Sequence, residues 1–225
     1  MAVKNGLMIG VVHRDPSGEE RLYRLLRDMK PTLITLEISP YALAFRQENS
    51  RRLVAELERL VPPEQRNHGE IQAIYEMLKI PFEVRAAARL EQAMPVRFEC
   101  IDDSEFSRRF LAKVESEIII SENLSTLLGS PDVALEQRID VYYRRFHELR
   151  KREPVHASEF GFSSAELAEM AHRDDQMERR IRELRQDHRW VHVGGVAHLI
   201  SVDGAMLLWD RFRNEDMQRL FLDEA

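Results

Sequence analysis

The apolar positions of this chain fall into short continuous runs that are separated by longer stretches with helical spacing. The runs at 7–12, 32–38, 96–101 and 189–194 are short and bounded by turn residues, which is typical of buried strands. Between the first two runs, residues 17–30 place leucines three and four positions apart, as in an amphipathic helix. A strand, a helix and a strand joined by short links indicate a parallel, right-handed β-α-β unit.

The second half of the chain is mostly helical in pattern. From 104 to 187 the spacing is that of helices, with breaks at "LGSPD" and "REPVHASEFGFS", and the tail predicts a short helix and a last strand. The expected fold class is α/β, with a mostly parallel central sheet flanked by helices and a long helical half inserted before the last strands. We expect one domain over 1–225, in which 1–103 and 188–225 form the sheet core and 104–187 the helical half.

Composition narrows the class of protein. The chain has 225 residues, 44% of them hydrophobic and 32% charged, and its net charge of −6 argues against nucleic-acid and anionic-membrane partners. No run approaches the ~18 apolar residues of a membrane span, and the N-terminal apolar stretch is too short for a signal peptide. The single Cys100 fits a reducing compartment. We therefore expect a cytoplasmic protein, and the sequence leaves open whether it forms a homo-oligomer.

Two of the strand-like runs end with the same spacing of glycine and histidine. "GVVH" covers Gly10–His13 and "GVAH" covers Gly195–His198. Loops at the carboxyl ends of parallel strands meet in one crevice, where ligands bind, and a glycine there lets a ligand approach the backbone. Two unrelated, inert loop histidines would give the same pattern. The functional interpretation is that both histidines share one site.

Glu37 ends the second apolar run, in "TLITLEI". An unpaired carboxylate at such a position is costly, so Glu37 needs a cation, a metal or hydrogen-bond donors. One interpretation is a strand-end glutamate that nearby backbone amides bind. The other is a ligand or an acid–base group that faces His13.

A charged pair interrupts the apolar stripe of a later helix. Asp174 stands where the next apolar residue belongs, between Met170 and Met177. A charge in that place is expensive unless it is paired, and Arg173 on the adjoining edge could pair with Glu37. Both a structural ion pair at one end of the core and an arginine that orients substrate remain open.

These residues together resemble the TraB/PrgY family, which is related to the Tiki metalloproteases and more distantly to erythromycin esterase and the ChaN-like proteins. The family has a first strand ending in G-x-x-H, a second strand ending in glutamate, and a late helix followed by a second G-x-x-H. Similar stretches here are "GVVH", "PTLITLEI", "HGEIQAIYEM", "FECIDDSEFSRR", "HRDDQMERRI" and "GVAH". Departures are His172, where the family usually has glutamate, and Asp102 with Asp103 in place of its aspartate–arginine pair.

The resemblance implies a site at the crevice that joins the two halves of the chain. Residue by residue, the positions of this chain that match the family's motifs, and that are therefore expected to form the site, are Gly10, His13, Glu37, Arg173, Gly195 and His198. His13, Glu37 and Arg173 are then the expected catalytic residues. Gly10, Gly195 and Asp174 are expected to contact a bound cofactor, and His13, His198 and Glu37 to bind a metal.

Three functions fit this set of residues. Two imidazoles and a carboxylate suit zinc, manganese or cobalt and leave positions open for water, which indicates a metal-dependent hydrolase. The resemblance to Tiki implies cleavage of peptide bonds. The resemblance to erythromycin esterase implies a metal-free hydrolase, in which one histidine is the general base and Glu37 orients it. The resemblance to the ChaN-like and PrgY proteins implies the third function, a binding protein that sequesters a peptide or a haem-like ligand. The expected partner is thus a peptide or a small molecule.

Overall fold

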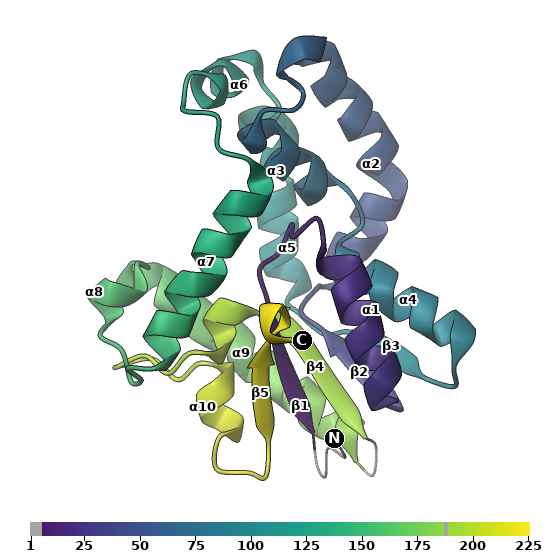
Figure 1. The fold of residues 1–225 in the computed structure, drawn as a ribbon, viewed down its shortest axis with the longest axis vertical. Helices are drawn as coiled ribbons and strands as arrows, with labels where there is room; N and C mark the ends of the chain where they lie inside the picture. Colours follow the sequence, from purple (N-terminus) through teal and green to yellow (C-terminus); the bar gives the residue numbers. More distant parts are fainter. Residues whose placement is uncertain (1–5, 187–188) are drawn as a thin grey trace.

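The sheet of the protein is parallel throughout. The computed structural model describes residues 6–186 and 189–225. Within these residues the sheet has five strands in the order β3-β2-β4-β1-β5 (Figure 1). Their bounds are Leu7–Val11 for β1, Leu33–Leu36 for β2, Arg97–Cys100 for β3, Trp190–Gly195 for β4 and Gln218–Phe221 for β5. The expected α/β class is confirmed, and the predicted strand in the tail is present as β5.

The strand β4 lies between β1 and β2, although it is far from both in the sequence. Gly10 of β1 pairs with Gly194, and Leu36 of β2 pairs with Val193. All residues of β1, β2 and β4 are buried, because helices cover both faces of the sheet. This arrangement brings the two glycine–histidine motifs and Glu37 to the same edge.

The first half of the chain contributes four helices to the described structure. They are α1 (Gly18–Met29), α2 (Pro40–Leu60), α3 (Gly69–Leu78) and α4 (Phe82–Ala93), with a short 3₁₀ turn, η1 (Pro63–Gln65), before α3. The Ser17 side chain, which precedes α1, makes no capping bond, and the Asp15 carboxylate accepts from the Ser17 N–H at 2.9 Å.

The second half is helical up to β4, as its spacing predicts. Its helices are α5 (Ser104–Leu111), a π-helical turn η2 (Val114–Ile118), α6 (Ser121–Leu128), α7 (Leu135–Arg150), α8 (Ala157–Phe160) and α9 (Ser164–Arg185). After β4 come the 3₁₀ turn η3 (Val196–Leu199), α10 (Leu208–Phe212) and, beyond β5, η4 (Leu222–Glu224). The boundary expected at 187–188, with His188, and the first five residues of the N-terminal segment lie outside the described residues.

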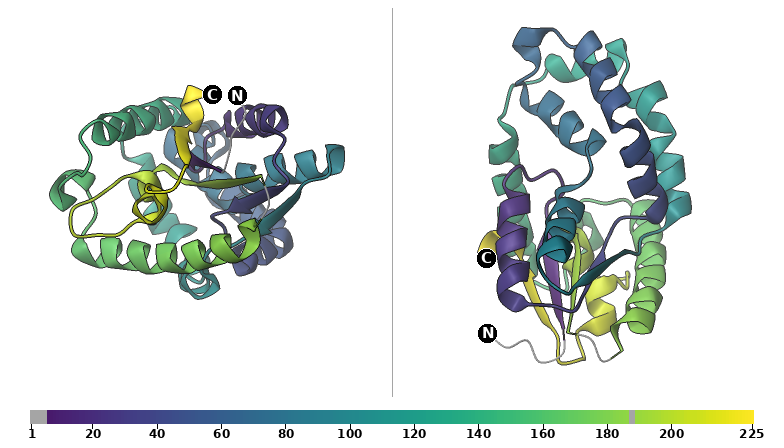
Figure 2. Two further views of the ribbon diagram at one scale, coloured as in Figure 1. Left: turned by 90° about the horizontal axis from the view of Figure 1, so that it is seen from below. Right: turned by 90° about the vertical axis from the view of Figure 1, so that its right-hand side faces the viewer.

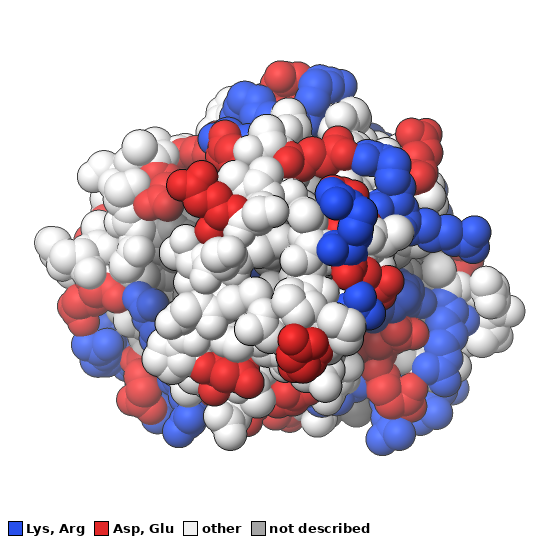
Figure 3. Space-filling model, turned by 90° about the horizontal axis from the view of Figure 1, so that it is seen from above, with Lys and Arg blue, Asp and Glu red and all other residues white. Residues whose placement is uncertain are grey.

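The helices form a layer on each face of the sheet and a group beyond its carboxyl edge. Both views of Figure 2 place α1 and α9 on opposite faces. In Figure 1, α2, α3 and α6 extend beyond the ends toward which the strands run. Figure 3, which views this end of the molecule, shows a largely uncharged centre, with basic side chains gathered on one side among acidic ones. In the described part of the chain, no helix has both the length and the apolar character that a membrane crossing requires.

Candidate active site

His13 lies in the turn that follows β1. Its Nδ1 is 2.7 Å from Oε1 of Glu83, a buried residue in the first turn of α4. Because the carboxylate can only accept, Nδ1 carries the proton and Nε2 of the neutral ring is an acceptor. Burial lowers the pKa of His13, but the hydrogen bond and charge of Glu83 outweigh burial and raise it above its ordinary value. With 48% of its side chain exposed, His13 is the accessible histidine of the pair.

His198 is buried in the 3₁₀ turn after β4, and both of its ring nitrogens face carboxylates. Nδ1 is 2.5 Å from Asp174 Oδ1, and Nε2 is 2.9 Å from Glu37 Oε1. Burial lowers the pKa of His198, but these two carboxylates raise it to about 10. His198 is therefore an imidazolium at neutral pH, with both N–H groups donating.

Glu37 connects the two halves of the chain through its carboxylate. Oε1 accepts from Arg173 Nη2 at 2.8 Å and from His198, and Oε2 accepts from the Gly195 N–H at 2.6 Å. Burial raises the pKa of Glu37, but His198 and Arg173 outweigh it and hold the pKa well below its ordinary value. Both kinds of partner considered from the sequence, backbone amide and cation, are present.

Arg173 is held in place by a second carboxylate. Asp102, which follows β3, accepts from Nε at 2.9 Å and from Nη2 at 2.8 Å, and the guanidinium stacks on Phe106 at 4.4 Å. The predicted pairing of Arg173 with Glu37 is confirmed. Within the part of the chain that the structure describes, Nη1 of Arg173 makes no hydrogen bond, and Arg173 lines both cavities at the site.

Asp174 is fully buried on α9, behind His198. Its Oδ1 binds His198 Nδ1, and its Oδ2 accepts from the Leu208 N–H at 2.8 Å. Burial raises the pKa of Asp174, and the charge of His198 opposes that rise. Its partner is thus His198, which anchors α9 to the second glycine–histidine motif. The carboxylate itself is out of contact with the cavities at the site.

The two motif glycines have different surroundings. A Cβ on Gly195 would lie 3.0 Å from His13 Nε2 and 3.5 Å from Glu37 Oε2, so its missing side chain leaves space between these groups. A Cβ on Gly10 would instead meet the ring of Phe221 at 2.7 Å. Gly195 thus serves the site, whereas Gly10 makes room for core packing beneath it.

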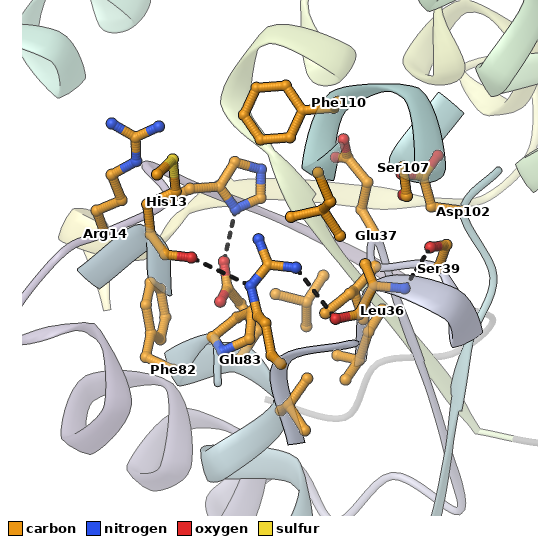
Figure 4. Close-up of a pocket in the computed structure, with 18 of the residues that line it drawn as sticks. His13, Arg14, Leu36, Glu37, Ser39, Phe82, Glu83, Asp102, Ser107 and Phe110 are labelled. Atoms are coloured by element: carbon orange, nitrogen blue, oxygen red, sulfur yellow. Dashed lines mark hydrogen bonds and ion pairs between the residues drawn. The ribbon is translucent and has the colours of Figure 1, made fainter. Parts of the chain in front are cut away.

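Two connected cavities open at this edge of the sheet. One of about 270 Å³ lies toward α2 and α4, and one of about 560 Å³ lies toward α7 and α9. Both are lined by His13, Arg14, Glu37, Phe106 and Arg173. Figure 4 shows the smaller cavity, with Glu83 bonded to the His13 ring and Phe110 on the other side of that ring.

Sequence reasoning missed Glu83, which orients His13 in place of Glu37. The signal was present in "PFEVRAAA", because Glu83 lies among residues that α4 buries, such as Phe82, Val84 and Ala86. A carboxylate inside such an apolar stretch needs a partner for the same reason as Asp174. Asp102 was noticed only as a departure from the family pattern, and it is the main partner of Arg173.

A divalent metal requires deprotonated donors that converge on one point. Among residues 6–186 and 189–225, no three His, Cys, Asp or Glu side chains are gathered in this way. His198 is protonated at neutral pH and donates from Nε2 to Glu37, whose Oε1 also binds Arg173. In this arrangement His13, His198 and Glu37 therefore do not fit a metal.

Within the described structure, three further residues make no hydrogen bond to the residues of the site. His172 is exposed on α9, where it contacts Gln176 at 2.9 Å. His192 is buried in β4 against Thr35, and burial lowers its pKa to about 4, so it is a neutral core histidine. Burial raises the pKa of Cys100 to about 11, which makes its thiol unreactive.

Comparisons with known proteins give no relative of this chain. It matches no protein-family model, and searches of curated proteins and of solved structures find no similar protein. The resemblance to the TraB/PrgY family therefore rests on the motifs and on their order along the chain.

Proposed function

We propose that this chain hydrolyses a carboxylic ester or amide, with His13 as the general base. The observation that carries the proposal is the pair of His13 and buried Glu83, in which Nε2 of the ring is left free at the cavity. A general base needs a free acceptor within reach of water and a pKa close to the working pH. His13 has a free acceptor at the cavity, and Glu83 outweighs burial and raises the pKa of His13 above the ordinary value near 6.5.

The space beside Gly195 is the proposed binding place of the attacking water. His13 Nε2 and Glu37 Oε2 both border this space, at 3.0 and 3.5 Å from the position of a Cβ. Oε2 accepts one hydrogen bond from the Gly195 N–H, so a lone pair remains for a second donor. A water there donates one hydrogen to His13 and the other to Glu37.

In this reaction His13 takes a proton from the attacking water and later gives it to the leaving group. His13 Nε2 takes a proton as the water oxygen bonds to the acyl carbon, and the carbonyl electrons move to the carbonyl oxygen. When the carbonyl reforms, the bond to the leaving alkoxide or amine breaks, and protonated His13 returns the proton to that group. The products are a carboxylic acid and an alcohol or amine.

Arg173 is the proposed partner of the developing negative charge. Arg173 lines both cavities, and Asp102 and Glu37 hold its guanidinium through Nε and Nη2, which leaves Nη1 without a partner among the described residues. Donors fixed before the reaction stabilise an oxyanion without reorganisation, which is a large part of enzymatic rate enhancement. The buried set Glu37, His198 and Asp174 keeps Arg173 and the water space in register.

The experiment is a turnover assay with p-nitrophenyl esters and a fluorogenic peptide, each with EDTA or added Mn²⁺. We expect ester hydrolysis that EDTA leaves unchanged. Activity that EDTA abolishes and Mn²⁺ restores would overturn the metal-free form and favour metal-dependent hydrolysis through His13, His198 and Glu37. Saturable binding without product would favour the sequestering protein instead.

The pH dependence of turnover follows from the pKa of His13. Since the base acts when neutral, kcat/KM should rise with pH, with a midpoint above 6.5. In Glu83→Gln the charge that raises the pKa is gone while burial remains, so the midpoint should fall below 6.5. The measurement is kcat/KM from pH 5 to 9 for both proteins. Identical midpoints would show that Glu83 does not act on the catalytic base.

Gly195→Ala is expected to remove most of the activity without unfolding the protein. The backbone of Gly195 has φ −60° and ψ 138°, which alanine adopts freely, but the methyl group enters the proposed water space. Activity should fall at least about tenfold, because a small misplacement at the reacting centre is costly. The matched control is Gly129→Ala, whose Cβ would meet only ordinary contacts of 3.4 Å and more. Full activity in Gly195→Ala would show that the attacking water does not bind beside Gly195.

A further inference from the structure

Two arginines that border the smaller cavity have no counter-ion. Within the described residues, neither Arg14 nor Arg46 forms an ion pair. Of the carboxylates that line this cavity, Glu37 and Asp102 pair with Arg173, Glu76 pairs with Lys79, and Glu83 accepts a hydrogen bond from the His13 ring. The positive charge on this wall is therefore open to an anion from outside the chain.

Arg46 is fixed by its own chain in a position to bind such an anion. From α2 its Nε donates to the Met77 carbonyl at 3.1 Å, and its Nη1 donates to the Ala42 carbonyl at 3.2 Å. These two bonds set the plane of the guanidinium and leave Nη2 without a partner among the described residues. Burial lowers the pKa of Arg46, because a half-buried cation without a counter-ion is poorly solvated. A bound anion would relieve that desolvation.

Arg14 occupies a backbone position that favours glycine. It follows His13 in a turn closed by the Asp15 N–H and the Val12 carbonyl, and its φ is 71°. A positive φ at the third residue of such a turn is typical of glycine, and a side chain there carries a local strain. Strained positions of this kind cluster at functional sites. Figure 4 shows Arg14 next to His13 at the cavity.

The larger cavity has a broader apolar wall, although Arg14, Arg138 and Arg173 also line it. Its wall includes apolar side chains from α7, α9, the connection between α8 and α9, and the turn after β4, namely Leu135, Ile139, Tyr142, Phe162, Met170 and Val196. Its charged residues Arg138, Glu166 and Glu169 already have partners in Glu70, Ser163 and Arg109. His13, Glu37 and Arg173 thus line both the cavity that contains the unpaired Arg46 and the cavity with the broader apolar wall.

We propose that the substrate is an ester or amide with a carboxylate on the acyl side and an apolar group on the leaving side. The carboxylate binds Arg14 and Arg46 in the smaller cavity, and the apolar group fills the larger one. The proposal rests on the hydrolase function proposed above, and it names the substrate class of that site. A carboxylate suits the planar donors of arginine, and a cavity lined mainly by apolar groups disfavours a doubly charged phosphate.

The test compares two esters with the same five-carbon acyl chain, mono-p-nitrophenyl glutarate and p-nitrophenyl pentanoate. Wild type should prefer the glutarate ester in kcat/KM by about tenfold or more, the effect of one charged hydrogen-bonding partner. Arg14→Gln and Arg46→Gln should bring this ratio close to one, and Arg14→Lys should retain part of it. The control is Arg51→Gln, an exposed arginine on α2, which should keep the wild-type ratio.

Arg14→Gly separates binding from folding. Glycine relaxes the positive φ, so the melting temperature should be at least that of wild type while the preference for glutarate is lost. Loss of the preference together with a lower melting temperature would indicate a structural role for Arg14 and overturn its part in binding. Competition by inorganic phosphate but not by glutarate would overturn the assignment of the anion as a carboxylate.

Binding distinguishes failure of this proposal from failure of the hydrolase. Titration calorimetry on His13→Ala uses glutaric acid monoanilide and pentananilide as stable probes. One outcome is that no ester is hydrolysed, but the monoanilide binds more tightly than pentananilide and this difference depends on Arg14 and Arg46. That result would support the proposed carboxylate recognition and contradict the hydrolase function. If both esters are hydrolysed equally and both anilides bind alike, the proposed substrate class is contradicted and the hydrolase function is supported.

Discussion

Replacing His13 with alanine is expected to lower kcat for ester hydrolysis by roughly 10²–10⁴-fold, the usual contribution of a general base. Nε2 of His13 is the accessible acceptor at the cavity, since the other site histidine donates from both nitrogens. Because nearly half of the His13 side chain is exposed, its removal should leave the melting temperature within a few degrees of wild type.

The same variant offers a chemical control. Removal of the His13 ring leaves a space that free imidazole can enter. Imidazole in the buffer should therefore restore part of the activity of His13→Ala. His172→Ala, which removes an exposed histidine on α9, should behave like wild type with and without imidazole. An unchanged kcat in His13→Ala would end the assignment of this residue as the base.

Asp174→Ala is expected to destabilise the protein by about 3–5 kcal/mol, as is usual when one partner of a buried ion pair is removed. Asp174 is fully buried, and its loss leaves the His198 imidazolium and the Leu208 N–H without their partner. The measurement is the free energy of unfolding in urea, with the slope checked for a change in compactness.

The neighbouring Asp175 provides a matched control on the same helix. It pairs with Arg179 and Arg211 near the surface, so Asp175→Ala should change stability by about 1 kcal/mol or less.

The stability lost in Asp174→Ala should depend on pH. The folded-state pKa of His198 is raised to about 10, so its pairing with Asp174 contributes its full stability below the unfolded pKa near 6.5, and this stability is lost as the pH rises toward 10. The deficit of Asp174→Ala should therefore shrink over that range. A constant deficit would mean that the charge on His198 is not involved.

Periodicity was sufficient to predict most of the fold. The four main strands are short apolar runs between turn residues, and a buried parallel strand produces that pattern without help from its neighbours. The order of the strands was beyond reach, because nothing local in residues 190–195 indicates that β4 separates β1 from β2. That order depends on packing across the whole chain.

For the candidate site, too, the sequence predicted some features and not others. His13, Glu37, Asp174 and His198 were conspicuous because each is a polar group at the end of an apolar run or inside an apolar stripe. Their pairings were less accessible, since a carboxylate within an apolar segment indicates that a partner exists but not which one. Thus Asp174 binds His198, and Glu83, not Glu37, orients His13.

The position of β4 in the middle of the sheet has a consequence for synthesis on the ribosome. β1 and β2 emerge early, but the strand that separates them follows α9. Until that segment is made, two buried apolar strands lack their final neighbour, and exposed strand edges favour aggregation. The nascent chain therefore leaves the facing edges of β1 and β2 unpaired for most of its translation. Insertion of β4 then joins β1 to β2 and, in the same event, brings His198 to Glu37, so the two glycine–histidine motifs meet only late in synthesis.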